Sequence, residues 1–441
     1  MSANSTSAKR TGPPNVLLIL TDDQGWGDLS YLGNSNIATP RIDRLAADGA
    51  VFDWFYVQPL CAPTRAEILT GRYYARTGVS GVQGGEERMR IDEVTLADRF
   101  RAAGYKTGCF GKWHSGQQYP YHPNGRGFDT FVGFCCGHWS HYFDSTIERN
   151  GEEFKSEGYL PDALTNHAIE FMRRHRGEPF LCYLPLNTPH SPFQVPDAFY
   201  RRFEDHPLPL RATHPEKEDL CKTRAALAMC ENIDANVGRA VDALDELGLG
   251  EDTIVIYLSD NGPNSWRWNG GMEGRKGSSD EGGVRSPCSV TWPGRIAPGT
   301  RIDRIAGAID LLPTLCDMCG ISVEEGAALD GLSLRALLCG EVDAKAWPDR
   351  RIFARQTRRP PTVSVRTQEF RAGGEQGGLY RLLEDVGQQR DLSEALPAEH
   401  AKLTKTIADW TADVGRAGAP PALPVGYAEF PRTDIPTQDA T

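Results

Sequence analysis

Short apolar runs alternate with longer amphipathic patterns along this chain, and this alternation limits its fold more than any other feature. Runs typical of buried strands occupy residues 15–20, 107–113, 179–186, 253–260 and 288–292. Patterns typical of helices occupy residues 39–49, 94–103, 162–174, 219–247 and 308–319. Strands that alternate with helices predict an α/β fold, in which helices cover both faces of a large, mostly parallel sheet.

A change of composition near residue 340 predicts a second, smaller unit. Residues 15–343 contain all the alternating patterns and are expected to form the main domain. Residues 344–361 are rich in Arg and Pro and are interpreted as a linker. Residues 362–370 and 379–384 favour an antiparallel pair and residues 398–414 an amphipathic helix, so 362–414 are expected to form a small C-terminal α+β subdomain. Residues 1–14 and 415–441 are expected to be tails.

Composition and charge exclude several classes of protein. Of 441 residues, 39% are hydrophobic and 24% are charged, which is ordinary globular usage and excludes global disorder. The net charge of −11 argues against a nucleic-acid partner, because a phosphate backbone attracts a basic face. The 11 cysteines are odd in number and include no pair of C-x-x-C motifs, so buried free thiols are expected rather than disulfides or a zinc site.

The first apolar run, residues 16–20, is too short to be the apolar core of a secretory signal. A membrane span needs about 20 apolar residues. We therefore expect no membrane span and a cytoplasmic location, or a periplasmic or secreted one if a leader precedes this sequence.

Oxygen-bearing side chains follow two of the predicted strands. Asp22 and Asp23 end the first strand, and Asp260 and Asn261 end the fourth. Ligands of open α/β sheets bind beyond the carboxyl ends of strands. Three carboxylates and an amide oxygen suit Ca²⁺ or Mg²⁺. The alternative is that both pairs only form turns, which Asp and Asn favour.

The string Cys61-Ala-Pro-Thr-Arg65 precedes Thr70-Gly-Arg72. Arg65 is spaced to place a guanidinium beside Cys61 or beside an anionic substrate. A helix that begins within residues 66–69 would add an N-terminus that attracts an anion. Taken alone, Cys61 is more typical of a buried structural thiol before a helix.

Three further strings carry cations or imidazoles. Lys112 and His114 end the second strand, His190 lies between two prolines after the third, and Lys276 lies in a glycine-rich loop. Each has a structural alternative: a packed histidine, a rigid turn or a solvated loop. Together, Arg65, Lys112, Lys276 and a divalent metal would surround one anionic group while the histidines move protons. This set predicts a site that cleaves a sulfate or phosphate ester.

These strings resemble those of the type I sulfatases, the arylsulfatase-like group of the alkaline-phosphatase superfamily. That group carries C-x-P-x-R followed by T-G-R, and residues 61–65 and 70–72 match it. The G-K-W-H, T-P-H and D-N-G strings and the loop lysine occur in the same order, so the resemblance spans residues 15–414. Thr64 stands where Ser is commoner, and Ser115 where Leu is common. The region after Pro348 is short and Arg-rich for the group.

The resemblance implies an alkaline-phosphatase-like fold and a sulfuric ester hydrolase. It implies that a formylglycine-generating enzyme oxidises Cys61 to formylglycine, whose hydrated form attacks sulfur. It also implies that Asp22, Asp23, Asp260 and Asn261 bind Ca²⁺. By the same resemblance, His190 with Lys276 would protonate the leaving oxygen, His114 would take the proton that expels sulfate, and Arg65 and Lys112 would hold the formylglycine and the sulfate.

Two loops predict the substrate. Residues 137–142 and 266–271 are rich in aromatic and polar groups, and they resemble loops of bacterial sulfatases that act on sulfated polysaccharides. We therefore expect His138, His141, Arg267 and Trp268 to bind a sulfated carbohydrate, or a sulfated small molecule. The alternative is that the tryptophans pack these loops onto the core. Two other functions stay open: a phosphonate monoester or phosphodiester hydrolase of the same superfamily, and a non-catalytic binding protein.

Overall fold

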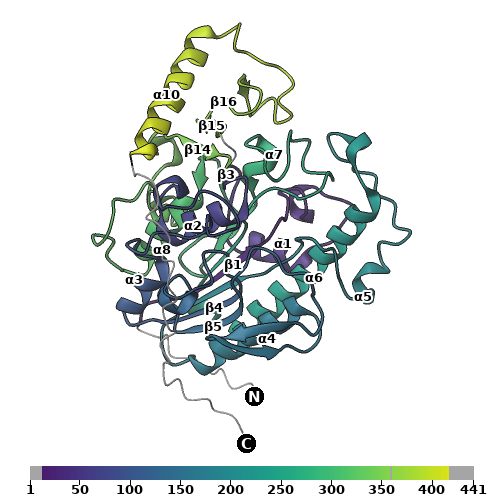
Figure 1. Cartoon of the computed structure of the whole chain (residues 1–441), viewed down its shortest axis with the longest axis vertical. Helices are drawn as coiled ribbons and strands as arrows, with labels where there is room; N and C mark the ends of the chain where they lie inside the picture. Colours follow the sequence, from purple (N-terminus) through teal and green to yellow (C-terminus); the bar gives the residue numbers. More distant parts are fainter. Residues whose placement is uncertain (1–11, 358–359, 417–441) are drawn as a thin grey trace, which may run out of the picture.

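A computed structural model of the chain describes residues 12–357 and 360–416, and its centre is a ten-stranded sheet (Figure 1). The strand order is β12-β2-β11-β9-β1-β8-β4-β5-β6-β7. The middle strands are β9 (Thr253–Ser259), β1 (Asn15–Thr21), β8 (Phe180–Pro185), β4 (Lys106–Lys112) and β5 (Thr130–Phe134). The outer strands are β12 (Thr300–Ile302), β2 (Ala50–Phe52), β11 (Cys288–Thr291), β6 (Thr146–Arg149) and β7 (Glu152–Lys155).

The sheet is parallel at its centre and mixed at its edges. The five middle strands all pair in parallel, whereas β11 pairs antiparallel with both β9 and β2, and β6 pairs antiparallel with both β5 and β7. The predicted mostly parallel sheet is therefore confirmed at the centre. Of the outer strands, β11 was predicted as residues 288–292. The others, β12, β2, β6 and β7, were not predicted, because each offers only three or four residues of pattern.

Helices cover both faces of the sheet, as the alternation predicts. On β1, Leu17 and Ile19 pack with α1 (Pro40–Ala47), α4 (Leu160–Arg174) and α6 (Leu220–Glu246). Val16, Leu18 and Leu20 point to the other face and pack with α2 (Cys61–Thr70), α3 (Leu96–Ala102) and α8 (Leu311–Met318). Because successive side chains of a strand alternate between faces, one apolar run supplies both cores.

Shorter elements complete the large unit. A three-stranded sheet has the order β10 (Arg285–Ser286), β3 (Phe55–Tyr56) and β13 (Ala306–Gly307). The short helices are α5 (Asp197–Tyr200), α7 (Glu281–Val284) and α9 (Arg335–Leu338). Single 3-10 turns occupy Ser30–Leu32, Tyr74–Arg76, Pro123–Gly125, Pro215–Lys217, Gly250–Asp252, Ala308–Asp310 and Ala344–Ala346. Within the described ranges, no helix has both the length and the apolar character needed to cross a bilayer.

The C-terminal unit is an antiparallel sheet with one helix, at one end of the molecule in Figure 1. Its strands, in spatial order, are β14 (Ile352–Arg355), β15 (Val363–Arg366), β16 (Phe370–Gly373) and β17 (Leu379–Arg381). The helix is α10 (Pro397–Gly415). The predicted tails fall almost wholly on residues 1–11 and 417–441, which lie outside the described residues.

Two expectations for this unit need correction. The range interpreted as a linker, 344–361, contains β14, whose Phe353 pairs with Val365 of β15. Arginine and proline residues on both sides of this short apolar run hid it from a composition argument. The two segments expected to pair directly are separated by β16, because residues 362–370 turn back after Arg366.

Trp410 packs α10 against the rest of the C-terminal unit. Its indole stacks on Phe353 at a centroid distance of 4.6 Å and meets Tyr73 edge-on at 5.0 Å. Phe353 belongs to β14, and Tyr73 follows α2 of the large unit. One side chain therefore joins α10 to both the C-terminal sheet and the large unit.

We expect Trp410→Ala to destabilise the protein by about 3 kcal/mol, because it leaves a cavity between three elements. Urea unfolding followed by fluorescence and circular dichroism measures this change. Leu383→Ala is the control, because that side chain is 59% exposed and its loss should change stability by less than about 0.5 kcal/mol. Equal unfolding midpoints for the two variants would contradict the role of Trp410.

Candidate active site

The residues predicted to do chemistry meet at the carboxyl edge of the central strands. Asp22 and Asp23 follow β1, Lys112 is the last residue of β4, and Asp260 follows β9. His190 lies five residues beyond β8. Because these four strands are parallel neighbours, their carboxyl ends share one edge, which is where ligands of open α/β sheets bind.

Cys61 is the first residue of α2, which corrects the expectation that this helix begins within residues 66–69. Leu60 is extended and Pro63 fits the first turn, where its missing N–H removes no helical hydrogen bond. The Cys61 Sγ and carboxylate oxygens of Asp22 and Asp260 lie within 4.8 Å of one another. Burial raises the pKa of the Cys61 thiol. The thiol therefore lies at a helix N-terminus, beside the carboxylates at the strand ends.

Three buried oxygens at the strand ends have no hydrogen-bond donor among the described residues: Asp22 Oδ1, Asp23 Oδ2 and Asn261 Oδ1. The amide of Asn261 is oriented, because its Nδ2 donates to Asp23 Oδ1 at 2.8 Å and leaves Oδ1 free. Asp23 has a φ of 66°, an uncommon backbone conformation for a residue other than glycine. Unpaired buried oxygens are costly unless something binds them, so this set fits a hard divalent cation such as Ca²⁺.

Each of the three carboxylates has a close cationic partner. Lys112 Nζ lies 2.7 Å from Asp22 Oδ2, and Lys276 Nζ lies 2.5 Å from Asp23 Oδ1. Arg65 Nη2 donates to Asp260 Oδ2 at 2.8 Å. The three negative and three positive charges cancel, so a bound divalent cation would leave the site positive and attract an anion.

Burial and neighbouring charges shift the pKa values of Asp260 and Asp23 in opposite directions. Burial, followed by the nearby Asp22, raises the pKa of Asp260 to about 6. Burial also favours the neutral form of Asp23, but Lys276, His190 and Lys112 together hold the pKa of Asp23 below its usual value. Adjacent cations therefore keep Asp23 ionised inside the protein.

The two site histidines are held in opposite tautomers. His114 Nε2 lies 2.8 Å from the Val82 carbonyl oxygen, which only accepts, so Nε2 carries the proton. The other nitrogen, Nδ1, is buried and unpaired among the described residues, so its lone pair is free. Burial, reinforced by Lys112, lowers the pKa of His114 well below its usual value. His114 is therefore a neutral base with one available nitrogen.

His190 presents its other ring nitrogen to the site. Its Nδ1 lies 2.6 Å from the Ser191 carbonyl oxygen and must donate to it. Nε2 then faces Asp23 Oδ2 at 3.6 Å. Burial lowers the pKa of His190 to about 4, although Asp23 opposes the shift. The Tyr142 hydroxyl donates to the His190 carbonyl oxygen at 2.9 Å and fixes this segment.

The structure corrects the expectation that Arg267 binds substrate. Its side chain is buried, and its Nε and Nη2 donate to Asp28 at 2.8 and 2.6 Å. Nη2 also donates to the Asp23 carbonyl oxygen at 3.0 Å. The guanidinium therefore supports the Asp23 turn. Sequence reasoning missed this role because Asp28 lies 239 residues away.

The other predicted substrate residues differ in position. Trp268 is partly buried against Gly27, where an added Cβ would lie 3.0 Å from its ring, which agrees with the alternative that it packs a loop. His138 is exposed, and its ring centroid lies 4.9 Å from that of His190, at the mouth of the site. His141 is also exposed, and its role stays a prediction. Tyr142 and Val82 were missed, because nothing local marks a residue that acts through His190 or His114.

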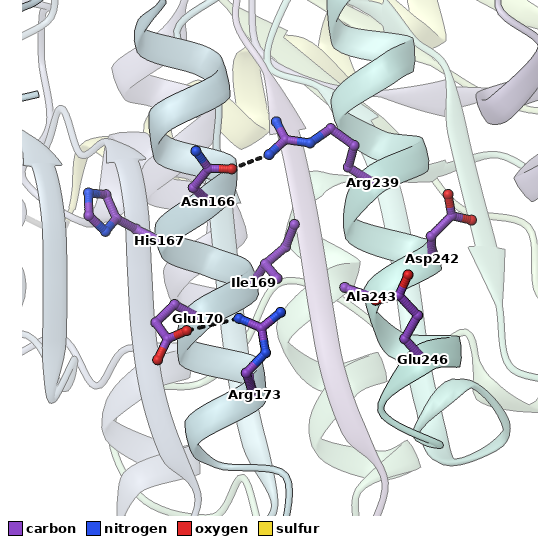
Figure 2. Close-up of a pocket in the computed structure, with 9 residues that line it drawn as sticks. All are labelled: Asn166, His167, Ile169, Glu170, Arg173, Arg239, Asp242, Ala243 and Glu246. Atoms are coloured by element: carbon purple, nitrogen blue, oxygen red, sulfur yellow. Dashed lines mark hydrogen bonds and ion pairs between the residues drawn. The ribbon is translucent and has the colours of Figure 1, made fainter. Parts of the chain in front are cut away.

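A separate groove lies between α4 and α6 (Figure 2). It has a volume of about 590 Å³ and is lined by charged side chains, with Arg239 bonded to Asn166 and Arg173 bonded to Glu170. The C-terminal halves of α4 and α6 lead to the starts of β8 and β9, so this groove lies toward the opposite edge of the sheet from the site.

Comparison with known proteins agrees with this geometry. The family model described as Sulfatase matches residues 14–321. Arylsulfatase A of Bos taurus is 35% identical over 371 residues, which cover 74% of this chain and 68% of that protein. N-acetylgalactosamine-6-sulfatase of Canis lupus familiaris is 31% identical over 381 residues, which cover 77% of this chain and 68% of that protein.

A solved structure extends the likeness to the whole fold. Ps i-CgsB, in complex with k-i-k-neocarrahexaose, superposes with a TM-score of 0.82 at 28% identity. The match covers 93% of this chain and 94% of that one, and so includes most of the C-terminal unit. Sequence, fold and site together show that this chain belongs to the sulfatase family, the hydrolases of sulfuric esters.

Proposed function

We propose that this protein hydrolyses a sulfate ester of a carbohydrate, using a formylglycine made from Cys61 and a bound Ca²⁺. One observation carries the proposal. Cys61 begins α2 beside Asp22 and Asp260, and unpaired oxygens of Asp22, Asp23 and Asn261 are buried at the same edge. A nucleophile position, a hard-cation site and three cations therefore converge on one place.

A metal ion and a formylglycine would supply charge and a nucleophile. Asp22, Asp23, Asp260 and Asn261 would hold Ca²⁺, which would stabilise negative charge on the sulfate oxygens. A formylglycine at position 61 would supply a hydrated aldehyde, which offers one hydroxyl for attack and a second to release the product without attack by water.

The residues of the chain would then orient the ester and move protons. Lys112 lies beside Asp22 and would place positive charge next to a sulfate oxygen. His114 has an unpaired Nδ1, which suits it to accept a proton near position 61. His190 and Lys276 lie against Asp23 and would supply the positive charge or the proton that a leaving oxygen needs.

The modification of Cys61 is testable by mass and by turnover. We expect peptide 45–65, from protein co-expressed with a formylglycine-generating enzyme, to show conversion of the thiol to an aldehyde. We expect Cys61→Ala to lower kcat on 4-nitrophenyl sulfate by about 1000-fold or more, because it removes the covalent step.

Cys221→Ala is the matched control, because it removes an exposed thiol at the start of α6, outside the candidate site, and should keep full activity. Parallel assays with phenylphosphonate monoesters separate the two hydrolase classes. Faster hydrolysis of the phosphonate would favour the alternative function. Unchanged turnover in Cys61→Ala would refute the nucleophile.

The metal site is testable without any measurement of activity. We expect Ca²⁺ to raise the melting temperature of metal-free protein, because it binds oxygens that only the folded state assembles. Asn261→Ala should weaken Ca²⁺ binding by about 10- to 100-fold in isothermal titration calorimetry, the range seen when a metal site loses an oriented polar partner. Asn166→Ala, in the groove between α4 and α6, should bind Ca²⁺ as the wild type does. Equal affinities for all three proteins would reject this metal site.

The carbohydrate part of the proposal is supported by the position of His138. This imidazole is exposed and lies beside His190, where the alcohol portion of the ester would leave. A related structure holds an oligosaccharide, k-i-k-neocarrahexaose. An imidazole in this position would donate or accept one hydrogen bond with a sugar hydroxyl.

We expect His138→Ala to lower kcat/KM on a sulfated oligosaccharide about tenfold, the effect of losing one hydrogen bond to substrate. The loss on 4-nitrophenyl sulfate should be smaller, because that ester lacks sugar hydroxyls. His175→Ala is the control, since His175 precedes β8 at the opposite edge of the sheet. Equal losses on both substrates would contradict a sugar contact.

A further inference from the structure

The loop that carries Lys276 spans two parts of the site. Gly274 and Gly277 have φ values of +84° and +85°, so the loop turns sharply on both sides of the lysine. The Lys276 N–H donates to the Pro263 carbonyl oxygen at 3.0 Å, and the Gly277 N–H donates to that of Pro59 at 2.8 Å. Pro263 lies near Asn261, and Pro59 precedes Cys61. The path of this loop therefore decides where the Lys276 ammonium lies relative to both.

Four buried charges anchor the end of this loop to the C-terminal sheet. Arg371 Nη2 lies 2.5 Å from Asp280 Oδ1, and Arg366 Nε lies 3.2 Å from Glu281 Oε2. All four side chains are at most 6% exposed. Arg366 on β15 and Arg371 on β16 are directly paired across the sheet. Two adjacent acids, Asp280 at the end of the loop and Glu281 at the start of α7, thus face two paired arginines. We call these four residues the ionic clasp.

Gln388 completes the attachment from the segment after β17. Its Oε1 accepts from the Glu281 N–H at 2.9 Å, and its Nε2 donates to Asp280 Oδ1 at 3.0 Å. Its φ is +52°, an uncommon conformation for glutamine that the surrounding contacts must maintain. The Ser279 carbonyl oxygen accepts from Arg366 Nη2 at 2.8 Å and from Ser364 Oγ at 2.9 Å. Three consecutive loop residues, 279–281, are therefore fixed by the C-terminal unit.

Stability alone does not account for buried ion pairs of this kind. The cost of removing charges from water offsets most of their attraction, and apolar residues of similar volume are often equally stabilising. Charged pairs differ in being directional, because a guanidinium and a carboxylate attract strongly only in a narrow geometry. The clasp is thus suited to setting the position of the loop.

We propose that the ionic clasp lets the C-terminal sheet position Lys276 for catalysis, so that Arg366, Arg371 and Gln388 are positioning residues of the active site. They lie beyond residue 321, where the family match ends. The proposal rests on the proposed function, in which the charge of Lys276 stabilises the leaving oxygen. A displaced Lys276 would therefore harm esters with basic leaving groups most.

A series of aryl sulfates tests the clasp. We expect Arg371→Gln to lower kcat on phenyl sulfate about 10- to 100-fold, as a displacement of about 1 Å would. On 4-nitrophenyl sulfate, whose leaving group needs little protonation, kcat should fall by less than about threefold. KM should be nearly unchanged for both esters. Lys276→Ala should show the same bias, and Arg371→Lys should recover part of the loss. Rates are normalised to the fraction of converted Cys61.

Arg381→Gln is the matched control, because Arg381 lies on β17 of the same sheet but pairs with Glu369 and Glu384 instead of with the loop. It should show no bias between the two esters. Equal losses of Arg371→Gln on both esters, or no loss, would overturn the positioning role.

Hydrogen exchange separates failure of the clasp from failure of the proposed function. We expect Arg371→Gln to speed amide exchange in residues 274–284 while Arg381→Gln leaves it unchanged. If the wild type hydrolyses no sulfate ester, the proposed function fails and exchange alone decides the clasp. Unchanged exchange in Arg371→Gln would overturn the clasp even in an active sulfatase.

Discussion

The structure depends on a balance of buried charge at the carboxyl edge of the central sheet. Asp22, Asp23 and Asp260 would repel one another if no cations were present. Lys112, Lys276 and Arg65 offset them one by one, at 2.7, 2.5 and 2.8 Å. These six residues come from β4, α2, a glycine-rich loop and the turns after β1 and β9. The site therefore forms only when all these segments reach their final positions.

The same balance explains why many further residues support the charged side chains of the site. Each charged side chain needs a fixed direction, so further residues hold the segments that carry them. Arg267 holds the carbonyl group of Asp23, Tyr142 holds that of His190, and the Val82 carbonyl group selects the tautomer of His114. The ionic clasp extends this support into the C-terminal sheet. The two structural units thus share one site, although their sequences differ in pattern and composition.

Much of this architecture could be predicted from the sequence, and the exceptions have physical causes. Four of the five middle strands and the long helices were visible because each repeats its apolar period several times, whereas β5 was not predicted. β14 was missed because only three apolar residues, 352–354, lie between its flanking arginines, which is too short to show a periodic pattern. Arg267 was assigned to substrate because a loop arginine beside tryptophans suits a sugar, whereas its partner Asp28 is distant in sequence. From the sequence, Trp268 could either contact a sugar or pack its loop onto the core. Only its position against Gly27 favours the packing role.

The sequence alone determined which chemical groups are present and the order along the chain of the strands that carry them. Strings such as residues 61–65 and 260–262 are local, so the spacing of their side chains is set by a few covalent bonds. The tertiary structure decided which nitrogen of each histidine is free, which oxygens remain unpaired, and which arginines are already bound to a carboxylate. These properties depend on contacts between residues far apart in the sequence, such as the hydrogen bonds from Arg267 to Asp28, 239 positions away, and no local pattern encodes such contacts.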